Sequence, residues 1–307
     1  MKNFDANPAQ AISFLQQQGA YLETEMFKAQ YPELKYKQFV DIDNKAPAWT
    51  NTVVTRGSDV AGKMKPLGVS GTDIATADIG YKQENLPITT FALGYNYTIQ
   101  EIGFAMMMGE NLDSSKAVAV REVTERDLNQ VYLNGDASLG ITGVFDNAQV
   151  PTSTAGSTIA AAIASGDAKN VIDIFSAAYN VVYFDQTNTT HKPSVFGVPT
   201  KQYLLLSQNF CNFGNASNIS FLQALQIAFP DMTFIDDINL VGIGAEGTDR
   251  LVCYKKSTQV LKGYEPMYLE WQPIATADNV TFRRASITRS GGVYWATPAA
   301  GHYVDGV

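Results

Sequence analysis

Few residues of this chain have the types and spacing of a chemical site, and the most suggestive run is rich in glycine. Gly242-Ile243-Gly244-Ala245-Glu246-Gly247 has the spacing of the dinucleotide-binding motif. That motif needs a helix directly after the glycines, because the helix N-terminus holds the pyrophosphate. The residues that follow, Thr248 to Tyr254, are instead typical of a strand. The run therefore predicts a hairpin loop rather than a nucleotide site.

Side chains for nucleophilic or metal chemistry are scarce. The two histidines, His191 and His302, and the two cysteines, Cys211 and Cys253, cannot supply a conventional His/Cys zinc site or a disulfide framework. Both cysteines have apolar neighbours in the sequence, which favour protonated and unreactive thiols. Carboxylate pairs for acid and base catalysis stay open, because their separation is spatial. Since the sequence nominates no such pair, we expect no catalytic residue, no metal and no cofactor.

Composition indicates a folded protein that is not a general binder of polyanions. Hydrophobic residues make up 45% of the 307 residues, enough for a large core. Lysine plus arginine total 22 against 30 aspartate plus glutamate, so the net charge is -8, the wrong sign for general binding of nucleic acid or anionic membranes. The start of the chain lacks the apolar region of a signal peptide, and no later stretch approaches about 18 consecutive apolar residues. We expect an intracellular protein without a membrane span.

Two consecutive helices are the clearest local prediction. Thr98-Ile99-Gln100-Glu101 is a capping box, in which the Thr and Glu side chains satisfy reciprocal backbone N–H groups, and the helix is expected to stop at Gly109. Its methionines, Met106 to Met108, are expected to fill a core. A second helix of about 20 residues is predicted from residue 113 or 114 to the Asn134-Gly135 stop. Its outward charges of both signs suit a solvated face or contact with an equivalent neighbour.

The segments around these helices differ from them in residue pattern. Residues 46–93 carry scattered glycines with short β-type runs near each end, and they predict a long two-stranded excursion. Such a loop is usually functional or an interaction element, although a flexible insertion is the alternative. Residues 1–45 are expected to form an arm, with a helix that starts at Asn7-Pro8. Helix and strand patterns alternate from about 160 to 262, and strand patterns follow to the end, so the whole reads as α+β.

This order of segments resembles the major capsid proteins of tailed bacteriophages, which have the Hong Kong 97 type fold. The resemblance is most specific over residues 97–147, YTIQEIGFAMMMGENLDSSKAVAVREVTERDLNQVYLNGDASLGITGVFDN, which looks like the family's spine-helix region and its Gly-Ile-x-Gly exit. Elsewhere the similarity rests on segment order. It implies an α+β protein with an N-terminal arm over 1–45, an extended loop over 46–93, a peripheral domain over 94–160 and 263–307, and an axial domain over 161–262.

By the same resemblance the chain is a major capsid protein and not an enzyme. The family assembles hexamers and pentamers into an icosahedral shell around double-stranded DNA, with the extended loop reaching over a neighbouring subunit. The acidity is compatible, because a container in which packaged DNA slides should not neutralise many phosphates. The implied partners are copies of the chain, the enclosed DNA without sequence-specific binding, and scaffolding, portal or decoration proteins. The implied location is the virion capsid, assembled in the cytoplasm of the bacterial host.

Seven charged residues are expected at contacts between copies, because exposed charges at repeated contacts fix register more than affinity. They lie in the extended loop and on the second helix: Arg56, Lys63, Lys65, Arg121, Glu122, Glu125 and Arg126. Some members of the family cross-link a loop lysine covalently to a neighbouring subunit, but no partner motif can be matched to Lys63 or Lys65.

Two other functions are compatible with these patterns. An encapsulin-like bacterial nanocompartment shares the fold and encloses a cargo enzyme. An intracellular α+β enzyme would use the Gly242–Gly247 loop or a carboxylate cluster at the junction of the two packing units, and it would be a monomer stabilised by its ligand.

Overall fold

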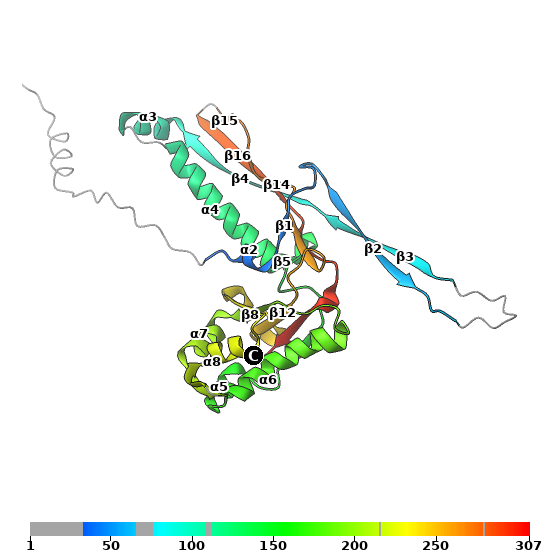
Figure 1. Cartoon of the computed structure of the whole chain (residues 1–307). Helices are drawn as coiled ribbons and strands as arrows, with labels where there is room; N and C mark the ends of the chain where they lie inside the picture. Colours follow the sequence, from blue (N-terminus) through cyan, green and yellow to red (C-terminus); the bar gives the residue numbers. More distant parts are fainter. Residues whose placement is uncertain (1–32, 66–75, 109–111, 215, 279) are drawn as a thin grey trace, which may run out of the picture. The chain divides into compact units, whose positions relative to one another are not determined.

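A computed structural model describes residues 33–65, 76–108, 112–214, 216–278 and 280–307 (Figure 1). The chain divides into two units, Met1–Glu33 and Leu34–Val307, and the elements below belong to the second. The helix predicted at Asn7-Pro8, the stop predicted at Gly109 and residues 66–75 of the predicted extended loop lie outside the described residues.

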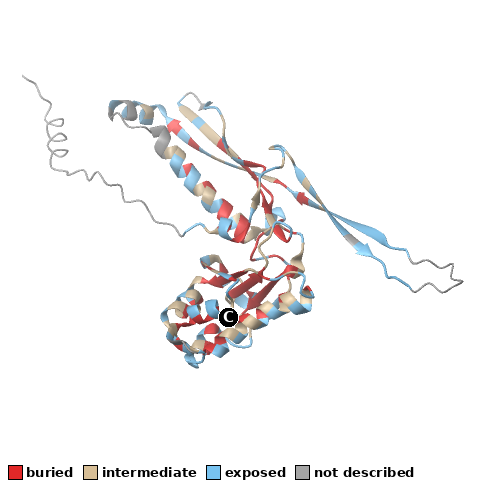
Figure 2. Ribbon diagram, viewed as in Figure 1, coloured by how far each residue is buried: buried red, intermediate tan, exposed pale blue. Residues whose placement is uncertain are grey.

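Residues 52–61 and 78–87 form a two-stranded antiparallel ribbon. Strand β2 (Thr52–Ala61) pairs with β3 (Asp78–Pro87) along its whole length, from Thr52 opposite Pro87 to Ala61 opposite Asp78. Near its base the ribbon packs through Val53 and Leu86 against Tyr264 and Tyr294. Its outer residues are exposed (Figure 2). The two-stranded excursion predicted for this part of the chain is confirmed.

Both predicted helices are present. The capping box forms as expected, since the Glu101 N–H donates to Thr98 Oγ1 at 3.2 Å and the Thr98 N–H donates to a Glu101 carboxylate oxygen at 3.1 Å. It starts helix α3 (Ile99–Met108). Helix α4 (Leu112–Leu133) ends just before Gly135, whose φ of 79° is a conformation that favours glycine.

Helix α4 packs on an antiparallel sheet. Strand β4 (Thr89–Thr98) pairs with all ten residues of β16 (Thr281–Ser290), and β14 (Met267–Trp271) and β15 (Ala275–Asp278) pair with successive parts of β16. Tyr95, Tyr97 and Val120 form the apolar contact between the helix and the sheet. The alternation along β4, with Tyr95 and Tyr97 buried and Asn96 exposed, is the pattern of a strand with one covered face.

A second sheet has five strands, and its three inner strands are buried on both faces. Its order is β11 (Thr233–Asp237), β8 (Val195–Pro199), β12 (Arg250–Tyr254), β18 (Gly301–Asp305) and β7 (Thr152–Thr154). Alternate side chains enter two cores: Phe196, Leu251 and Val304 lie in one, and Val195, Val252 and Tyr303 in the other. The first core is completed by helices α5 (Ile159–Ala164), α6 (Ala168–Asn180), α7 (Thr200–Gln208) and α8 (Phe221–Ala228), and α6 continues as a π-helical segment (Val181–Gln186) (Figure 1).

Strand pairing in this sheet joins segments on both sides of the expected boundaries near residues 160 and 262. Strands β8, β11 and β12 lie inside 161–262, whereas β7 and β18 lie outside it. The remaining strands form small sheets: β1 (Ile42–Asp43) with β13 (Leu261–Tyr264) and β17 (Gly292–Trp295), β5 (Gly135–Asp136) with β6 (Ile141–Thr142), and β9 (Phe210–Phe213) with β10 (Ala216–Ser220).

The hairpin predicted at Gly242–Gly247 is wrong in topology. The loop connects β11 to β12, but β8 lies between those two strands, so the loop crosses over a neighbouring strand. A strand follows the glycines, as predicted, and the helix that a pyrophosphate site needs does not. The loop is held by side chains, because Asp249 accepts from the Gly242 N–H at 2.9 Å and Asp305 from the Ala245 N–H at 3.0 Å.

The last part of the predicted arm belongs to the core. Helix α2 (Tyr36–Phe39) stacks its Tyr36 ring on that of Tyr132, with centroids 5.3 Å apart, and places Phe39 edge-on to Phe145. The α2 backbone is held at both ends by distant parts of the chain. Asn129 Oδ1 accepts from the backbone N–H groups of Lys35 and Tyr36, both at 3.1 Å, and the Tyr254 hydroxyl donates to the Phe39 carbonyl at 2.6 Å. Tyr36, Phe39 and Val40 are therefore part of the interior of the fold.

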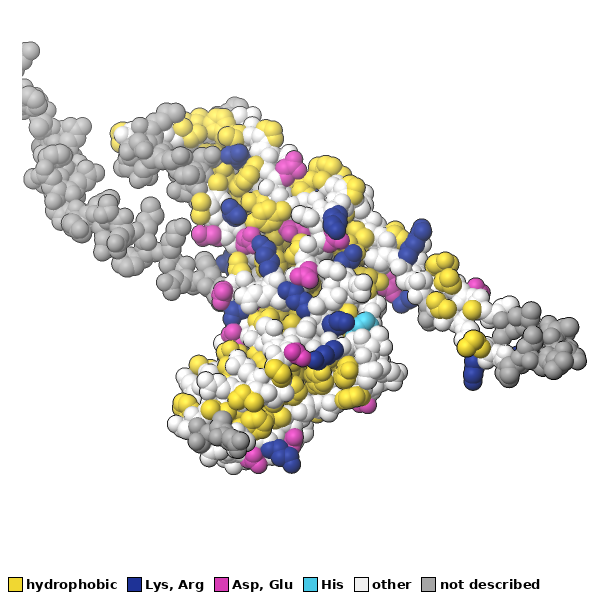
Figure 3. Space-filling model, in the orientation of Figure 1, with side chains coloured by type: hydrophobic (Ala, Val, Ile, Leu, Met, Phe, Trp, Pro, Cys, Tyr) yellow, Lys and Arg dark blue, Asp and Glu magenta, His cyan; other side chains and the backbone are white. Residues whose placement is uncertain are grey.

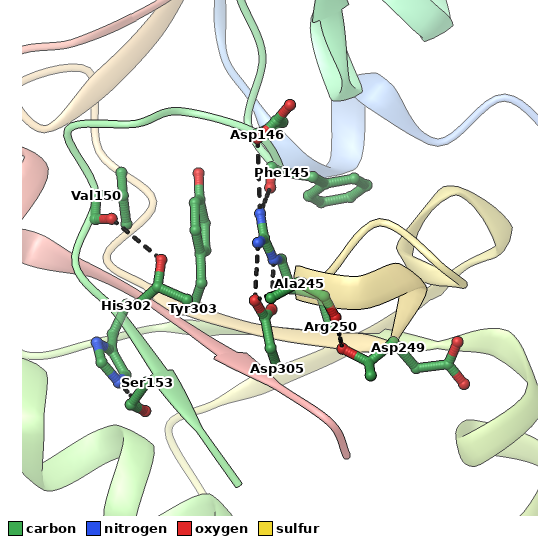
Figure 4. Close-up of polar contacts among 12 residues, drawn as sticks. Phe145, Asp146, Val150, Ser153, Ala245, Asp249, Arg250, His302, Tyr303 and Asp305 are labelled. Carbon is green, nitrogen blue, oxygen red and sulfur yellow. Dashed lines mark hydrogen bonds and ion pairs between the residues drawn. The ribbon is translucent and has the colours of Figure 1, made fainter.

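A buried ion pair joins β12, the central strand of the five-stranded sheet, to its neighbour β18 (Figure 4). Arg250 on β12 lies directly opposite Asp305 on β18 and donates to its two carboxylate oxygens at 2.6 and 3.0 Å. Arg250 also donates to the Phe145 carbonyl at 2.8 Å, and its guanidinium lies 4.8 Å from the Tyr303 ring centroid. Burial by itself raises the pKa of Asp305, but the hydrogen bonds from Arg250 and the Ala245 N–H outweigh it, so the pKa lies below its ordinary value.

We expect Asp305→Asn to destabilise the subunit by about 3–5 kcal/mol, because it leaves the Arg250 charge buried without a counter-charge. Urea unfolding of unassembled subunit, followed by circular dichroism, measures the loss. Asp146→Asn is the matched control, since Asp146 is 66% exposed and lies 3.8 Å from the same guanidinium, and it should cost under about 1 kcal/mol. Equal losses in the two variants would contradict the role given to Asp305.

Candidate functional site

The loop residues predicted at contacts lie on and beside the ribbon. Arg56 is on β2, opposite Gln83, and is exposed. Lys63 and Lys65 follow the end of β2 and are also exposed. Their shared property is that they are exposed on the ribbon or just after β2.

The ribbon has one face richer in apolar side chains than the other. Side chains directly opposite each other in an antiparallel pair share a face, so Val54, Val60, Ile79 and Tyr81 lie on the face that carries Arg56. Val60 and Tyr81 are 70% and 77% exposed. The reverse face carries the Lys82–Glu84 ion pair and Asp78. We call the first set, Val54, Val60, Ile79 and Tyr81, the apolar face of the ribbon.

The four predicted helix charges on α4 separate into two groups. Arg121, Glu122 and Arg126 are exposed. Glu125 is different, since its side chain is only 18% exposed and its two oxygens accept from the Tyr36 hydroxyl at 2.9 Å and the Tyr268 hydroxyl at 2.5 Å. Glu125 therefore binds α2 and β14 to α4 within the subunit.

A second carboxyl group near Glu125 has no counterpart among the sequence predictions. Glu265, between β13 and β14, is 7% exposed, and no described residue donates a hydrogen bond to its Oε1. Burial raises the pKa of Glu265 to about 7; the negative charge of Glu125 adds to the rise and Lys37 opposes it. Tyr36 and Tyr132 also face this group, and burial raises the pKa of each above its ordinary value. Glu265 is thus a buried acid that is protonated at mildly acidic pH.

Both cysteines lie in the apolar surroundings that their sequence neighbours predicted. Cys211 and Cys253 are unpaired and buried, and burial raises the pKa of both thiols. His302 is buried beside Ser153, with 2.8 Å between its Nε2 and the serine Oγ, and burial lowers its pKa (Figure 4). In the described ranges no three His, Cys, Asp or Glu side chains gather as a metal site would require, and no helix there has the length and apolarity to cross a membrane.

The expectation that the α3 methionines fill a core needs correction. Of the three, only the side chain of Met107 is described, and it is 74% exposed. Phe104, on the same helix, is 61% exposed. Helical spacing of apolar residues does not distinguish a face that meets the chain's own sheet from one left outside it. The sequence did contain a sign that some of these side chains are exposed, because the helix carries apolar residues on nearly every side.

Ionisation of Glu265 makes stability depend on pH in a defined direction. The folded carboxyl stays protonated up to about pH 7, whereas in the unfolded chain it ionises near its ordinary value of 4.5. Stability should therefore fall as pH rises from 4.5 to 7 and level off above. We expect Glu265→Gln to remove this component and to be more stable than the parent above neutrality, by up to about 3 kcal/mol.

Thermal and urea unfolding across this pH range test the expectation. Glu270→Gln is the control, because Glu270 is an exposed carboxyl on β14. Parallel stability curves for the parent and Glu265→Gln would contradict the assignment.

Comparison with known proteins identifies the family of this chain. The profile of the family described as Major capsid protein matches residues 62–307. The capsid of Myoviridae phage XM1 is similar in structure, with a TM-score of 0.81 at 18% identity, over 95% of this chain and 98% of that one. The capsid of a native GTA particle gives 0.66 at 11% identity, over 99% of both chains. A virus-like particle from Pyrococcus furiosus gives 0.55 at 12% identity, over 87% of this chain and 91% of that one. No curated protein sequence matches the chain.

The structural likeness confirms the predicted Hong Kong 97 type fold. The family match covers most of the chain and is a match to structural proteins of viral shells. The chain belongs to the Major capsid protein family, and it is a shell-forming subunit of a virion capsid that works as a multimer.

Proposed function

We propose that the chain assembles as hexamers and pentamers into an icosahedral shell that encloses double-stranded DNA. The family match over residues 62–307 carries this proposal. The net charge of -8 supports enclosure without sequence-specific binding, because an acidic wall gives few phosphate contacts. Assembly takes place in the bacterial host cytoplasm, with scaffolding, portal or decoration proteins as further partners. The subunit has no enzymatic role in this scheme.

Within this proposal the elements have distinct tasks. The β2–β3 ribbon is the extended loop, α4 is the spine helix of the peripheral domain, and the helices α5 to α8 belong to the axial domain. We assign β7 and β18 to the axial domain as well, since they complete its sheet. Residues 34–43 fasten the start of the described chain to α4 and to the axial sheet through Asn129 and Tyr254.

The ribbon contacts a neighbouring copy through its apolar face. An exposed apolar face on a two-stranded element is costly in water and is stabilised when a partner covers it. Arg56, at the centre of this face, and Lys63 and Lys65, beyond its end, fix the register of the contact. The charges Arg121, Glu122 and Arg126 on α4 act in the same way at a second contact, while Glu125 serves the interior of the subunit.

Two adjacent substitutions on β3 test the orientation of the ribbon. We expect Tyr81→Ser to reduce the assembled fraction about tenfold, because it removes a largely exposed aromatic ring from the apolar face. Lys82→Ser, on the reverse face, breaks only an exposed ion pair and should assemble like the parent. Sedimentation velocity at matched concentration measures the assembled fraction. Normal assembly of Tyr81→Ser, with impairment of Lys82→Ser, would mean that the other face makes the contact.

A second candidate function is an encapsulin-like compartment that encloses a protein cargo. The structural similarity to a virus-like particle from Pyrococcus furiosus supports this second candidate, because that similar chain forms a particle that is not described as a phage capsid. The contents of the shell separate the two candidates.

Electron microscopy of particles from the bacterium that produces the chain, with sedimentation and nuclease treatment, tests the proposal. We expect closed shells built of hexamers and pentamers that protect double-stranded DNA from nuclease. Shells that hold a defined protein and no DNA would favour the compartment. A uniform monomer of 33.4 kDa under all assembly conditions would contradict both.

A further inference from the structure

Helix α3 exposes apolar side chains on the side that faces away from its own subunit. Ile102 packs with Tyr95, Tyr97 and Val120 against the sheet. At about 100° per residue, Phe104 and Met107 project from the opposite side of the helix. They are 61% and 74% exposed, where an ordinary surface helix carries polar residues.

The exposed surface continues onto the neighbouring sheet. The Ile99 N–H donates to the Val280 carbonyl at 3.1 Å, so the start of α3 adjoins the start of β16. Ile99 and Val280 are 51% and 58% exposed. We call Ile99, Phe104, Met107 and Val280 the α3 patch. Figure 3 shows hydrophobic side chains gathered at the end of the molecule that carries α3 and β15.

Gly103 lies within this surface. It is four residues after Ile99 and four before Met107, so the three lie along the same side of the helix. A Cβ at Gly103 would meet no atom within 4 Å, so nothing in the described chain requires glycine there. Glycine inside a helix is less favourable than alanine. A close approach by another molecule to the α3 backbone supplies a reason for it.

Two described charges beside the patch, Lys116 and Glu101, neutralise each other within the subunit. Lys116 on α4 pairs with Glu101 at 3.0 Å, donates to the Asn96 carbonyl at 2.8 Å, and lies 5.0 Å from the Tyr97 ring centroid. The four residues of the patch are themselves uncharged, and this described pair adds no excess charge of one sign beside them. Such a surface can face a copy of itself without like-charge repulsion, which a charged patch cannot do.

We propose that the α3 patch packs against the α3 patch of a second copy of this chain, around a symmetry axis of the shell, with Gly103 at the closest approach. This contact rests on the proposed function, because only an assembled shell brings the copies together. It is separate from the ribbon contact, which uses a different element. Methionine suits it, since its flexible side chain adapts when the angle between neighbouring subunits varies from one part of the shell to another.

Two kinds of variant test the contact. Gly103→Ala fills open space in the single subunit, so the thermal midpoint of unassembled subunit should stay or rise. The same methyl group obstructs a close partner, and we expect the assembled fraction to fall about tenfold. Phe104→Cys places a thiol on the patch, and the buried Cys211 and Cys253 do not compete for a short bismaleimide cross-linker.

The expected result is a cross-linked dimer from Phe104→Cys shells and not from dissociated subunits. Lys169→Cys, at an exposed polar position on α6, is the control for accidental proximity. If the parent forms shells, unlinked Phe104→Cys subunits or parent-like assembly of Gly103→Ala would overturn the α3 contact alone. Cross-linking to a different protein would also overturn it. A parent that never assembles would overturn the proposed function together with this contact.

Discussion

Arg250 and Asp305 face each other across β12 and β18, two adjacent strands that are buried on both faces, and several segments of the chain meet at this pair. Asp305 also accepts from the Ala245 N–H, and Arg250 donates to the carbonyl of Phe145. The Phe145 N–H in turn donates to the carbonyl of Leu133, the last residue of α4, at 2.8 Å. A slip of β18 by one residue would turn the Asp305 side chain to the other face of the sheet and leave the guanidinium buried alone. The pair therefore ties the register of the five-stranded sheet to the C-terminal end of α4.

Features that depend on residues close together in the sequence could be predicted from it. The capping box at Thr98 and Glu101 formed because both partners lie within one helical turn, and the extent of α4 follows from a long helical pattern closed by Gly135. The strand after Gly247 was predictable for the same reason, since the strand-favouring residues Leu251 to Tyr254 are consecutive. The topology of the loop before it was not, because β8, which separates β11 from β12, is remote in the sequence.

Long-range partners explain what the sequence did not reveal. Tyr36 and Phe39 read as part of an arm, yet their backbone partners are Asn129 and Tyr254, the second of them 215 residues from Phe39. Glu125 reads as one of four equivalent helix charges, but two tyrosine hydroxyls from α2 and β14 occupy its oxygens. Spacing along a helix shows which side chains share a face; it does not show which face a distant segment covers. Glu265 was missed on the same grounds, since its burial depends on α2 and α4 together.

The exposed apolar surfaces follow from the physics of a shell subunit. A monomeric protein hides such surfaces in its own core, whereas a subunit must fold without them and bury them only on assembly. Each contact is repeated many times in a closed shell, so a modest favourable free energy of association at each contact is enough to hold the shell together. A weak contact can also dissociate when a subunit has been added in the wrong place. The ribbon and α3 fit this requirement, since both are narrow elements with a few exposed apolar side chains apiece. Strong attachment is instead kept inside the subunit, at Arg250 and Asp305, where no assembly step has to undo it.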